Sequence, residues 1–263
     1  MRLLLIGDIV GKPGRKVVGA VLPLARKKYS LDFIVANAEN SAAGSGITRD
    51  QYHELIDDGI DCITLGDHAL RKREIFETLD AEKRIVRPGN LSQEAPGKRY
   101  TILTAASGVQ VGVFCLLGRV FMSPVDCPFR AADLILDEIR QKDPELKVIL
   151  LDFHAEATSD KQLMGRHLDG RISAVLGTHT HVATADEQIL PGGTAFQCDV
   201  GMTGPFESII GRKINKVLDA VRTSRPTTYD VATGDLRMCG TVVEIDPETG
   251  LATKIERICI RAA

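Results

Sequence analysis

Basic residues are not in excess in this sequence of 263 residues. Its 33 lysines and arginines face 35 aspartates and glutamates, and the formal net charge is −2. Proteins that capture long nucleic acids or anionic membranes usually do so with a basic surface. The composition therefore argues against both kinds of partner, while small anions stay compatible with it.

Long apolar runs are missing as well. The first residues, 1–8, form too short an apolar stretch for a secretory signal peptide, and they reach an acidic side chain at once. No later run approaches the roughly 20 residues that cross a bilayer. We therefore expect a cytoplasmic protein with no membrane partner.

The cysteines show no C-x-x-C spacing, although the chain has six of them. Four lie inside or beside apolar runs, where a buried, reduced thiol is the ordinary state of a cysteine. None lies in a loop next to a histidine, so a cysteine nucleophile has little support. We therefore expect neither a disulfide framework nor thiol catalysis.

The glycine-rich signatures of nucleotide-binding loops are absent too. Residues 7–12 read G-x-x-x-G-K, one residue short of a P-loop, and Pro13 stands where that loop needs serine or threonine. No G-x-G-x-x-G follows the first predicted strand. The sequence thus argues against P-loop nucleotide hydrolases and dinucleotide-binding enzymes.

Short apolar runs alternate with amphipathic ones, a pattern typical of α/β proteins whose sheets are covered by helices. Strands are predicted at residues 3–6, 33–38, 60–65, 100–105, 109–117, 148–153, 172–176, 194–198, 238–246 and 253–260. Helices are predicted at residues 15–28, 48–58, 72–79, 131–141, 159–168 and 214–222. Because no internal repeat, linker or low-complexity tract is visible, we expect residues 1–263 to form a single domain.

Local signals refine these predictions. Pro23 should kink or divide the first helix, and Thr48 with Gln51 has the spacing of a capping box, as does Ser159 with Gln162. Residues 199–211, rich in glycine, are predicted to be a loop. Residues 118–130 are apolar for a loop, and we interpret them either as a segment folded over the core or as a lid over substrate.

Polar side chains that can bind metals follow five of the predicted strands. Residues 172–176 lead into His179 and His181, and in an extended backbone two residues so spaced point the same way. Such a backbone can present both imidazoles to one point in space. The other strands end in side chains of the same chemical kind: Asp8, Glu39, Asn40, Asp67, His68 and His154.

These side chains are expected to share one site, because ligands in open α/β sheets bind outside the carboxyl ends of the strands. Carboxylate, amide and imidazole groups together suit first-row metals such as iron, manganese or zinc. Without His68 the set offers seven ligands, which are too many for one tetrahedral zinc but fit two metals roughly 3.5 to 4 Å apart. Such a pair clamps a phosphoryl group and acidifies a bridging water, which indicates in-line hydrolysis of a phosphate ester.

Five short blocks resemble the ordered motifs of calcineurin-like metallophosphoesterases: Gly7-Asp8, Glu39-Asn40, Gly66-Asp67-His68, His154 and residues 177–181. Four longer stretches of sequence are similar to the bacterial YmdB-type phosphodiesterases: residues 7–15, 116–122, 152–159 and 177–182. The resemblance spans nearly the whole chain. It implies an αββα sandwich of two packed mixed sheets flanked by helices, with a di-iron or di-manganese centre that hydrolyses cyclic nucleotides.

The resemblance also implies a role for each residue. The first metal would be held by Asp8, Glu39, Asn40 and His181. Glu39 would bridge to the second metal, which would also be held by Asp67, His154 and His179. His68 matches the family's proton donor, and its alternative role is that of one more ligand. We expect two metal ions per chain, iron first, with manganese or zinc as alternatives.

Asp67 departs from the family, which has asparagine at this place. A carboxylate should hold cations more strongly than an amide oxygen does, and it lowers the net charge of the centre by one unit. Asp67 is expected either to bind the second metal or to be a partner of a histidine or a basic side chain.

Several small-molecule substrates would present a phosphate to the same metals: 2′,3′- or 3′,5′-cyclic nucleotides, RNA ends and phosphomonoesters. The rival interpretation from another class is a metal- and nucleotide-binding regulatory protein with little turnover. His68 argues for catalysis, because a pure binding site needs no acid at the leaving group. The sequence fixes neither the substrate nor the oligomeric state.

Overall fold

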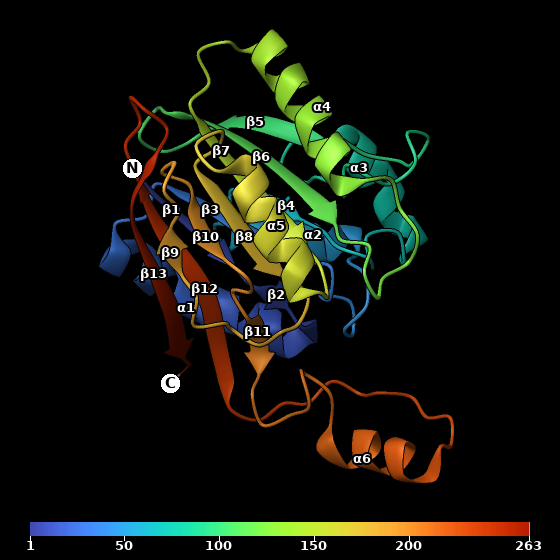
Figure 1. The fold of residues 1–263 in the computed structure, drawn as a ribbon. Helices are drawn as coiled ribbons and strands as arrows, with labels where there is room; N and C mark the ends of the chain where they lie inside the picture. The colour runs from blue at the N-terminus through green and yellow to red at the C-terminus, as the bar shows by residue number, and fades with distance from the viewer. Residues whose placement is uncertain (263) are drawn as a thin grey trace.

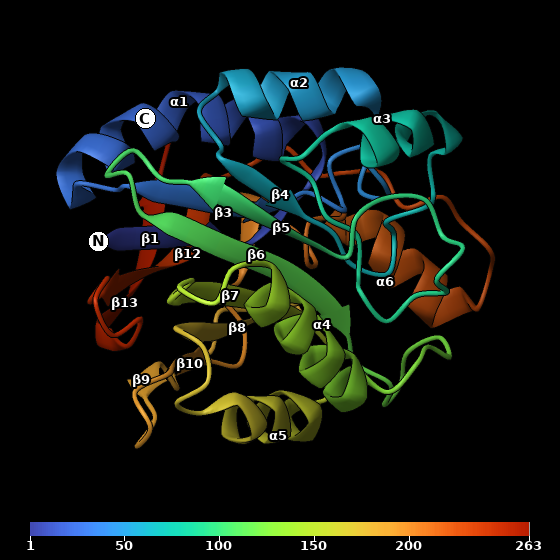
Figure 2. The ribbon, with the colours of Figure 1, turned by 90° about the horizontal axis from the view of Figure 1, so that it is seen from above.

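Two β-sheets packed face to face form the centre of the protein, with helices on the outer faces (Figures 1 and 2). The computed structural model describes residues 1–262. Each sheet mixes parallel and antiparallel pairs. The αββα sandwich that the sequence resemblance implied is therefore confirmed.

The first sheet has seven strands in the order β2-β11-β12-β1-β3-β4, with β13 paired to β12. Its parallel strands β1, β3 and β4 run side by side, so their carboxyl ends lie along one edge. The strands are β1 (Arg2–Ile6), β2 (Asp8–Ile9), β3 (Phe33–Asn37), β4 (Cys62–Thr64), β11 (Met202–Pro205), β12 (Leu236–Ile245) and β13 (Ala252–Arg261).

The second sheet has six strands in the order β5-β6-β7-β8-β10-β9. Strands β6, β7, β8 and β10 are parallel, while β5 and β9 join them as antiparallel edge strands. The predicted hairpin at residues 100–117 is confirmed as the β5–β6 pair. The strands are β5 (Tyr100–Thr104), β6 (Gln110–Leu117), β7 (Val148–His154), β8 (Ala174–Thr178), β9 (Gln188–Ile189) and β10 (Ala195–Gln197).

Helices α1, α2 and α3 lie over the first sheet, and α4 and α5 lie over the second (Figure 2). A short 3₁₀ turn, Arg73–Ile75, precedes α3. Helix α6 stands apart from the body (Figure 1), with Ala220 as its one buried residue. The helices are α1 (Gly11–Tyr29), α2 (Arg49–Asp57), α3 (Phe76–Ala81), α4 (Pro128–Lys142), α5 (Thr158–Leu168) and α6 (Ile214–Thr223).

Strand β1 shows how one apolar run serves two layers of core. Leu4 and Ile6 pack in the cluster beneath α1 and α2, while Leu3 and Leu5 face the second sheet. All four are fully buried. A strand buried on both faces is apolar at every position, which is why this run could be recognised from sequence.

Of the two outcomes predicted for Pro23, division of the helix is excluded. Helix α1 continues through Pro23, because Val18 and Leu22 are buried in the core and hold the helix together despite the lost hydrogen bond. Two other local predictions are wrong. Helix α5 begins one residue before Ser159, so that side chain does not cap it. Residues 202–205, predicted as loop, form β11, whose pairing with β2 and β12 could not be read from local sequence.

The other capping prediction is confirmed. Thr48 Oγ1 accepts a hydrogen bond from the Gln51 amide, and the Gln51 side chain accepts one from the Thr48 amide, so the start of α2 has a reciprocal cap. None of the helices within residues 1–262 combines the length and the apolar character needed to cross a bilayer.

Candidate metal centre

The polar residues predicted at the strand ends meet where the two sheets present the carboxyl ends of their strands. From the first sheet come Asp8 after β1, Glu39 and Asn40 after β3, and Asp67 and His68 after β4. From the second sheet come His154 at the end of β7, and His179 and His181 after β8. Residues more than 100 positions apart in sequence are thus brought together, and the prediction of one shared site agrees with their positions.

Atoms that could hold a metal ion fall into three overlapping groups, which share Glu39, Asp67 and His154. The first group consists of Asp8, Glu39 and His154. The second consists of Asp67, His154 and His179, and the third of Glu39, Asp67 and His68. The Nε2 atom of His154 lies 3.1 Å from Asp67 Oδ1 and 3.4 Å from Glu39 Oε1. Such convergence of carboxylates and imidazoles on common points is what a metal centre requires.

His154, His179 and His181 each direct one ring nitrogen toward the centre, while the other ring nitrogen contacts an oxygen atom on the opposite side of the ring. His154 Nδ1 lies 2.8 Å from the Thr178 hydroxyl, which donates to the buried carboxylate of Asp152. His179 Nε2 lies 3.1 Å from Glu156, and His181 Nδ1 lies 3.0 Å from the Ile210 carbonyl oxygen. An acceptor on the outer nitrogen fixes the tautomer that leaves a lone pair on the inner one, as in histidines that bind metals.

His179 and His181 do not have the extended backbone that would present both imidazoles to one point. Strand β8 ends at Thr178, and both histidines have positive φ angles, 102° and 65°. This turn directs His179 toward His154, with Nδ1 to Nε2 at 3.0 Å. It directs His181 toward Asn40, whose amide lies 3.2 Å from His181 Nε2. The two imidazoles therefore serve opposite sides of the centre.

Negative charge dominates the centre. Burial raises the pKa of Asp8, which is fully enclosed. Burial acts in the same direction on Glu39, yet the positive charge of His154 and hydrogen bonds from His154 and His68 lower the pKa of Glu39 below its usual range. Burial works against charge on His154, but Glu39 and Asp67 raise the pKa of its imidazole well above the usual value. A centre that draws a proton onto a buried imidazole would equally favour a cation.

The residues present fit metal ions, with one adjustment. A methyl group at Gly66 would lie 2.3 Å from Glu39 Oε2 and 2.4 Å from His154 Nε2, so only glycine lets the backbone approach this closely. Asn40 turns its amide nitrogen toward Glu39 (3.0 Å) and its oxygen toward His68 Nδ1 (2.9 Å). To bind a cation beside Glu39, Asn40 must present its amide oxygen instead of its amide nitrogen. A rotation of about 180° about the Cβ–Cγ bond exchanges the two atoms.

Comparison with known proteins identifies the family of this chain. The family described as YmdB-like protein matches residues 4–258, nearly the whole chain. The chain belongs to the YmdB-like family. A relative in Bacillus subtilis (strain 168), named 2′,3′-cyclic-nucleotide 2′-phosphodiesterase, is 46% identical over 260 residues, which are 99% of this chain and 97% of the relative.

Solved structures of similar proteins have the same fold. A hypothetical protein from Thermus thermophilus superposes with a TM-score of 0.92 at 40% identity, and the match covers 100% of both chains. A protein described as a novel phosphatase from Mycoplasma pneumoniae gives a TM-score of 0.90 at 30% identity, covering 99% of this chain and 93% of the other. Family membership and fold thus agree with the resemblance seen in the sequence.

A cavity of about 320 Å³ opens onto the centre of this YmdB-like chain. His68, Glu39, His179 and His181 are among the residues that line it. Asp67 is not part of the lining, but its Oδ2 lies 3.6 Å from His68 Nε2. Partly exposed His68 is therefore placed where it can reach both the cavity and the carboxylates.

Several residues of this centre were missed by sequence reasoning. Glu156 and Arg212 line the cavity, and Asp152 lies beneath His154. Burial raises the pKa of Asp152 to about 6, although three side chains donate hydrogen bonds to it. Glu156 stands two residues after His154 in a block that resembles the family, so its signal was present, whereas Arg212 has no motif around it.

The remaining histidines, His53 and His167, lie elsewhere. His53 is exposed on α2, and His167 pairs with Asp133 at 3.0 Å on α5. Within residues 118–130, Met122 and Phe129 pack against the core beneath α4 and α5, whereas Phe121 is 90% exposed. The segment therefore folds over the core at two of its three large apolar side chains, and its role as a lid stays a prediction.

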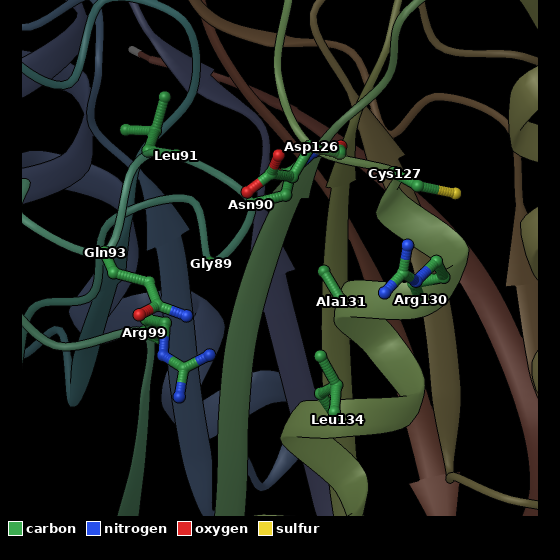
Figure 3. A pocket seen from close by; sticks show the side chains of 10 residues that line it. All are labelled: Gly89, Asn90, Leu91, Gln93, Arg99, Asp126, Cys127, Arg130, Ala131 and Leu134. Atoms are coloured by element: carbon green, nitrogen blue, oxygen red, sulfur yellow. The ribbon is translucent and has the colours of Figure 1, made fainter.

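A second pocket, of about 230 Å³, lies beside the start of α4 and shares none of its lining residues with the cavity at the centre (Figure 3). Arg99 and Arg130 stand on opposite sides of it (Figure 3). The side chain of Asn90 is engaged by the Leu117 and Asp126 backbone. The candidate metal-binding residues Glu39, Asn40, His179 and His181 line the first cavity and not this pocket.

Proposed function

We propose that this protein is a metal-dependent phosphodiesterase that hydrolyses 2′,3′-cyclic nucleotides at the centre between its two sheets. The geometry of three imidazoles, each fixed from outside and aimed inward among buried carboxylates, carries the proposal. The Bacillus subtilis relative, named for that activity and 46% identical, supports the choice of substrate. Because the ligands come from both sheets, we also propose that residues 1–263 act as one metallophosphoesterase domain.

Two cations per chain would be held by the seven side chains that the sequence indicated. Asp8, Asn40 and His181 lie on one side, Asp67, His154 and His179 lie on the other, and Glu39 lies between them. Bound there, the cations would supply Lewis acidity for the phosphoryl group and make an attacking water more acidic. Iron is our first expectation, and manganese and zinc suit the same ligands.

The chain's own residues would orient and protonate the substrate. His68 lines the cavity and has Nδ1 3.3 Å from Glu39 Oε1, a contact that orients its ring. Its Nε2 proton would pass to the oxygen that leaves the phosphorus, the role of a general acid. Arg212 lines the same cavity with a guanidinium that contacts backbone carbonyls, and it supplies positive charge beside an anionic substrate.

The test is metal analysis of the purified protein, combined with turnover of a panel of substrates. The panel contains 2′,3′- and 3′,5′-cyclic nucleotides, a chromogenic diester and a chromogenic monoester. We expect two metals per chain and preferred turnover of the 2′,3′-cyclic compounds. A chain that binds metal and nucleotide without turnover would instead be the regulatory protein, and preference for the monoester would indicate a phosphomonoesterase.

Two histidine variants separate the roles. We expect His154→Ala to lose a metal, because the Nε2 atom of His154 lies close to the carboxylates of both Glu39 and Asp67. We expect His68→Ala to keep both metals and to lose on the order of 10² to 10⁴ in turnover of substrates with poor leaving groups. His53→Ala, an exposed position on α2, is the matched control and should change neither property. Loss of metal in His68→Ala would make His68 a ligand instead.

A further inference from the structure

Four of the six cysteines are buried, as the sequence indicated, but two of the six are in contact across the C-terminal hairpin. Cys239 on β12 stands directly opposite Cys259 on β13 in the antiparallel register. Their sulfur atoms are 3.0 Å apart. Cys239 is 3% exposed, whereas Cys259 is open to solvent. The pairing was invisible in sequence because a long stretch of two strands and a turn separates the two thiols.

The backbone at this pair already suits a disulfide. Residues directly opposed in antiparallel strands have Cα atoms about 4.5 or 5.5 Å apart, and both distances lie within the range that a disulfide spans. Closing the gap between the sulfur atoms to a bond of about 2.05 Å needs a movement of about 1 Å. Strand β12 is held between β1, β11 and β13, while β13 pairs with β12 (Figure 1). The sulfur on the outer strand is therefore the one with freedom to move.

The surroundings favour reaction at the exposed thiol. The next cross-strand pair on the same face of the hairpin is Arg237 opposite Arg261, and both guanidinium groups contact Asp235. This trio leaves one net positive charge beside the thiols. The hydrogen bond from Cys239, together with the charge of Arg237, lowers the pKa of Cys259 to about 6, although partial burial opposes this. A thiolate at an accessible position is the nucleophile in thiol–disulfide exchange.

We propose that Cys239 and Cys259 form a thiol–disulfide exchange site that reacts with small anionic disulfides. The Cys259 thiolate attacks one sulfur of the small disulfide, and the other half leaves as a thiolate that takes up a proton. Cys239 then loses its proton to solvent and attacks Cys259 Sγ, and the second half leaves as a thiolate that takes up a proton from solvent. Two protein thiols are oxidised to one disulfide, and the small disulfide is reduced to two thiols.

The test uses the full-length, metal-loaded protein and glutathione disulfide as the probe. After equilibration at a series of glutathione ratios and acid quenching, we expect two of the six thiols to disappear together. Trypsin should then release residues 238–254 joined to residues 258–261, and this product should vanish after reduction. If these peptides stay unlinked at every ratio, the site does not exist.

Two variants test the order of events. Cys239→Ser should stop at a mixed disulfide between glutathione and Cys259, because no second thiol is present to resolve it. Cys259→Ser should take up little glutathione, since Cys239 is buried. Cys127→Ser, a half-buried cysteine before α4, is the control and should still form the linked peptides. Equal glutathione uptake by the first two variants would contradict the assigned roles, and Cys→Ala versions replace any serine variant that fails to fold.

Discussion

Asp67 is the residue at which this chain departs from the motif it resembles, and it points into the centre. Its Oδ1 lies 3.1 Å from His154 Nε2 and 3.4 Å from His179 Nδ1. Burial alone would raise the pKa of Asp67, but hydrogen bonds from these two imidazoles lower it below the usual range. A carboxylate so placed adds negative charge where cations are proposed to bind.

We predict that Asp67→Asn weakens metal binding at least about 10-fold, because the amide keeps the shape but removes one charge from the donor set. With metal in excess, KM for an anionic diester should fall, since the substrate meets less repulsion. The measurements are chelator competition and steady-state kinetics. Asp219→Asn, the same change on the distant helix α6, is the control and should alter neither. Unchanged metal affinity in Asp67→Asn would leave Asp67 as a partner of the histidines alone.

At the residue scale the sequence predicted which side chains gather at the centre, but not what surrounds them. Strand ends and motif spacing were sufficient for Asp8, Glu39 and His154. Their supports are joined by contacts that only the fold creates, as when Asn37 donates to Asp152 across 115 positions (2.9 Å). Ile210 acts through its backbone carbonyl, a role that no side-chain pattern can reveal.

At the scale of elements, the turn after β8 decides where two histidines point. Its positive φ angles are unfavourable for non-glycine residues by roughly 1 kcal/mol or more each, so other contacts must hold it. Asp199 does so: its Oδ2 accepts hydrogen bonds from the Thr180 amide (2.9 Å) and hydroxyl (2.8 Å). Lys161 on α5 pairs with the same oxygen at 2.8 Å, and both charged side chains are almost fully buried.

We predict that Lys161→Met destabilises the protein by about 3–5 kcal/mol, because it leaves the Asp199 charge buried without its partner. Urea unfolding measures this loss, and metal titration should show weaker binding because the turn loosens. The double variant Lys161→Met/Asp199→Asn should recover part of the stability, since no unpaired charge remains.

Lys254→Met provides the matched control. Its partner Glu256 is 3.0 Å away, but both side chains are exposed, at 64% and 43%. An ion pair in solvent contributes about 1 kcal/mol or less, so this variant should unfold near the wild-type urea concentration. Equal effects of the two lysine substitutions would show that the buried pair does not hold the turn.

Prediction of elements from sequence succeeded where a segment's own pattern determines its structure. The apolar strands and the reciprocal cap at Thr48 are of this kind. It failed where partners far along the chain decide, as for β11, which exists because β2 and β12 pair with it. The turn at His179 belongs to the second class, because Asp8 and Asp199 accept its backbone amides from other parts of the fold.

At the scale of the whole molecule, the centre joins the two sheets. Asp8, Glu39 and Asp67 belong to the first sheet, and His154, His179 and His181 to the second. In the absence of a cation, three carboxylates are held together in a largely buried space and repel one another. A cation between them would offset that repulsion and link both halves of the sandwich. Metal binding should therefore stabilise the folded chain as a whole, because the unfolded chain has no such preformed site.

We predict that removal of metal by a chelator lowers the melting temperature on the order of 5 °C, since a ligand at 100 times its Kd stabilises by about 2.7 kcal/mol and each kcal/mol shifts a chain of this size by about 2 °C. Calorimetry with metal analysis of the same samples measures this, and added metal should restore the original value. His154→Ala lacks the imidazole that lies close to both Glu39 and Asp67, so the chelator should lower its melting temperature much less. His53→Ala should respond like the wild type. If metal-free and metal-loaded chains melt at one temperature, cations do not join the two sheets in the way the centre's geometry indicates.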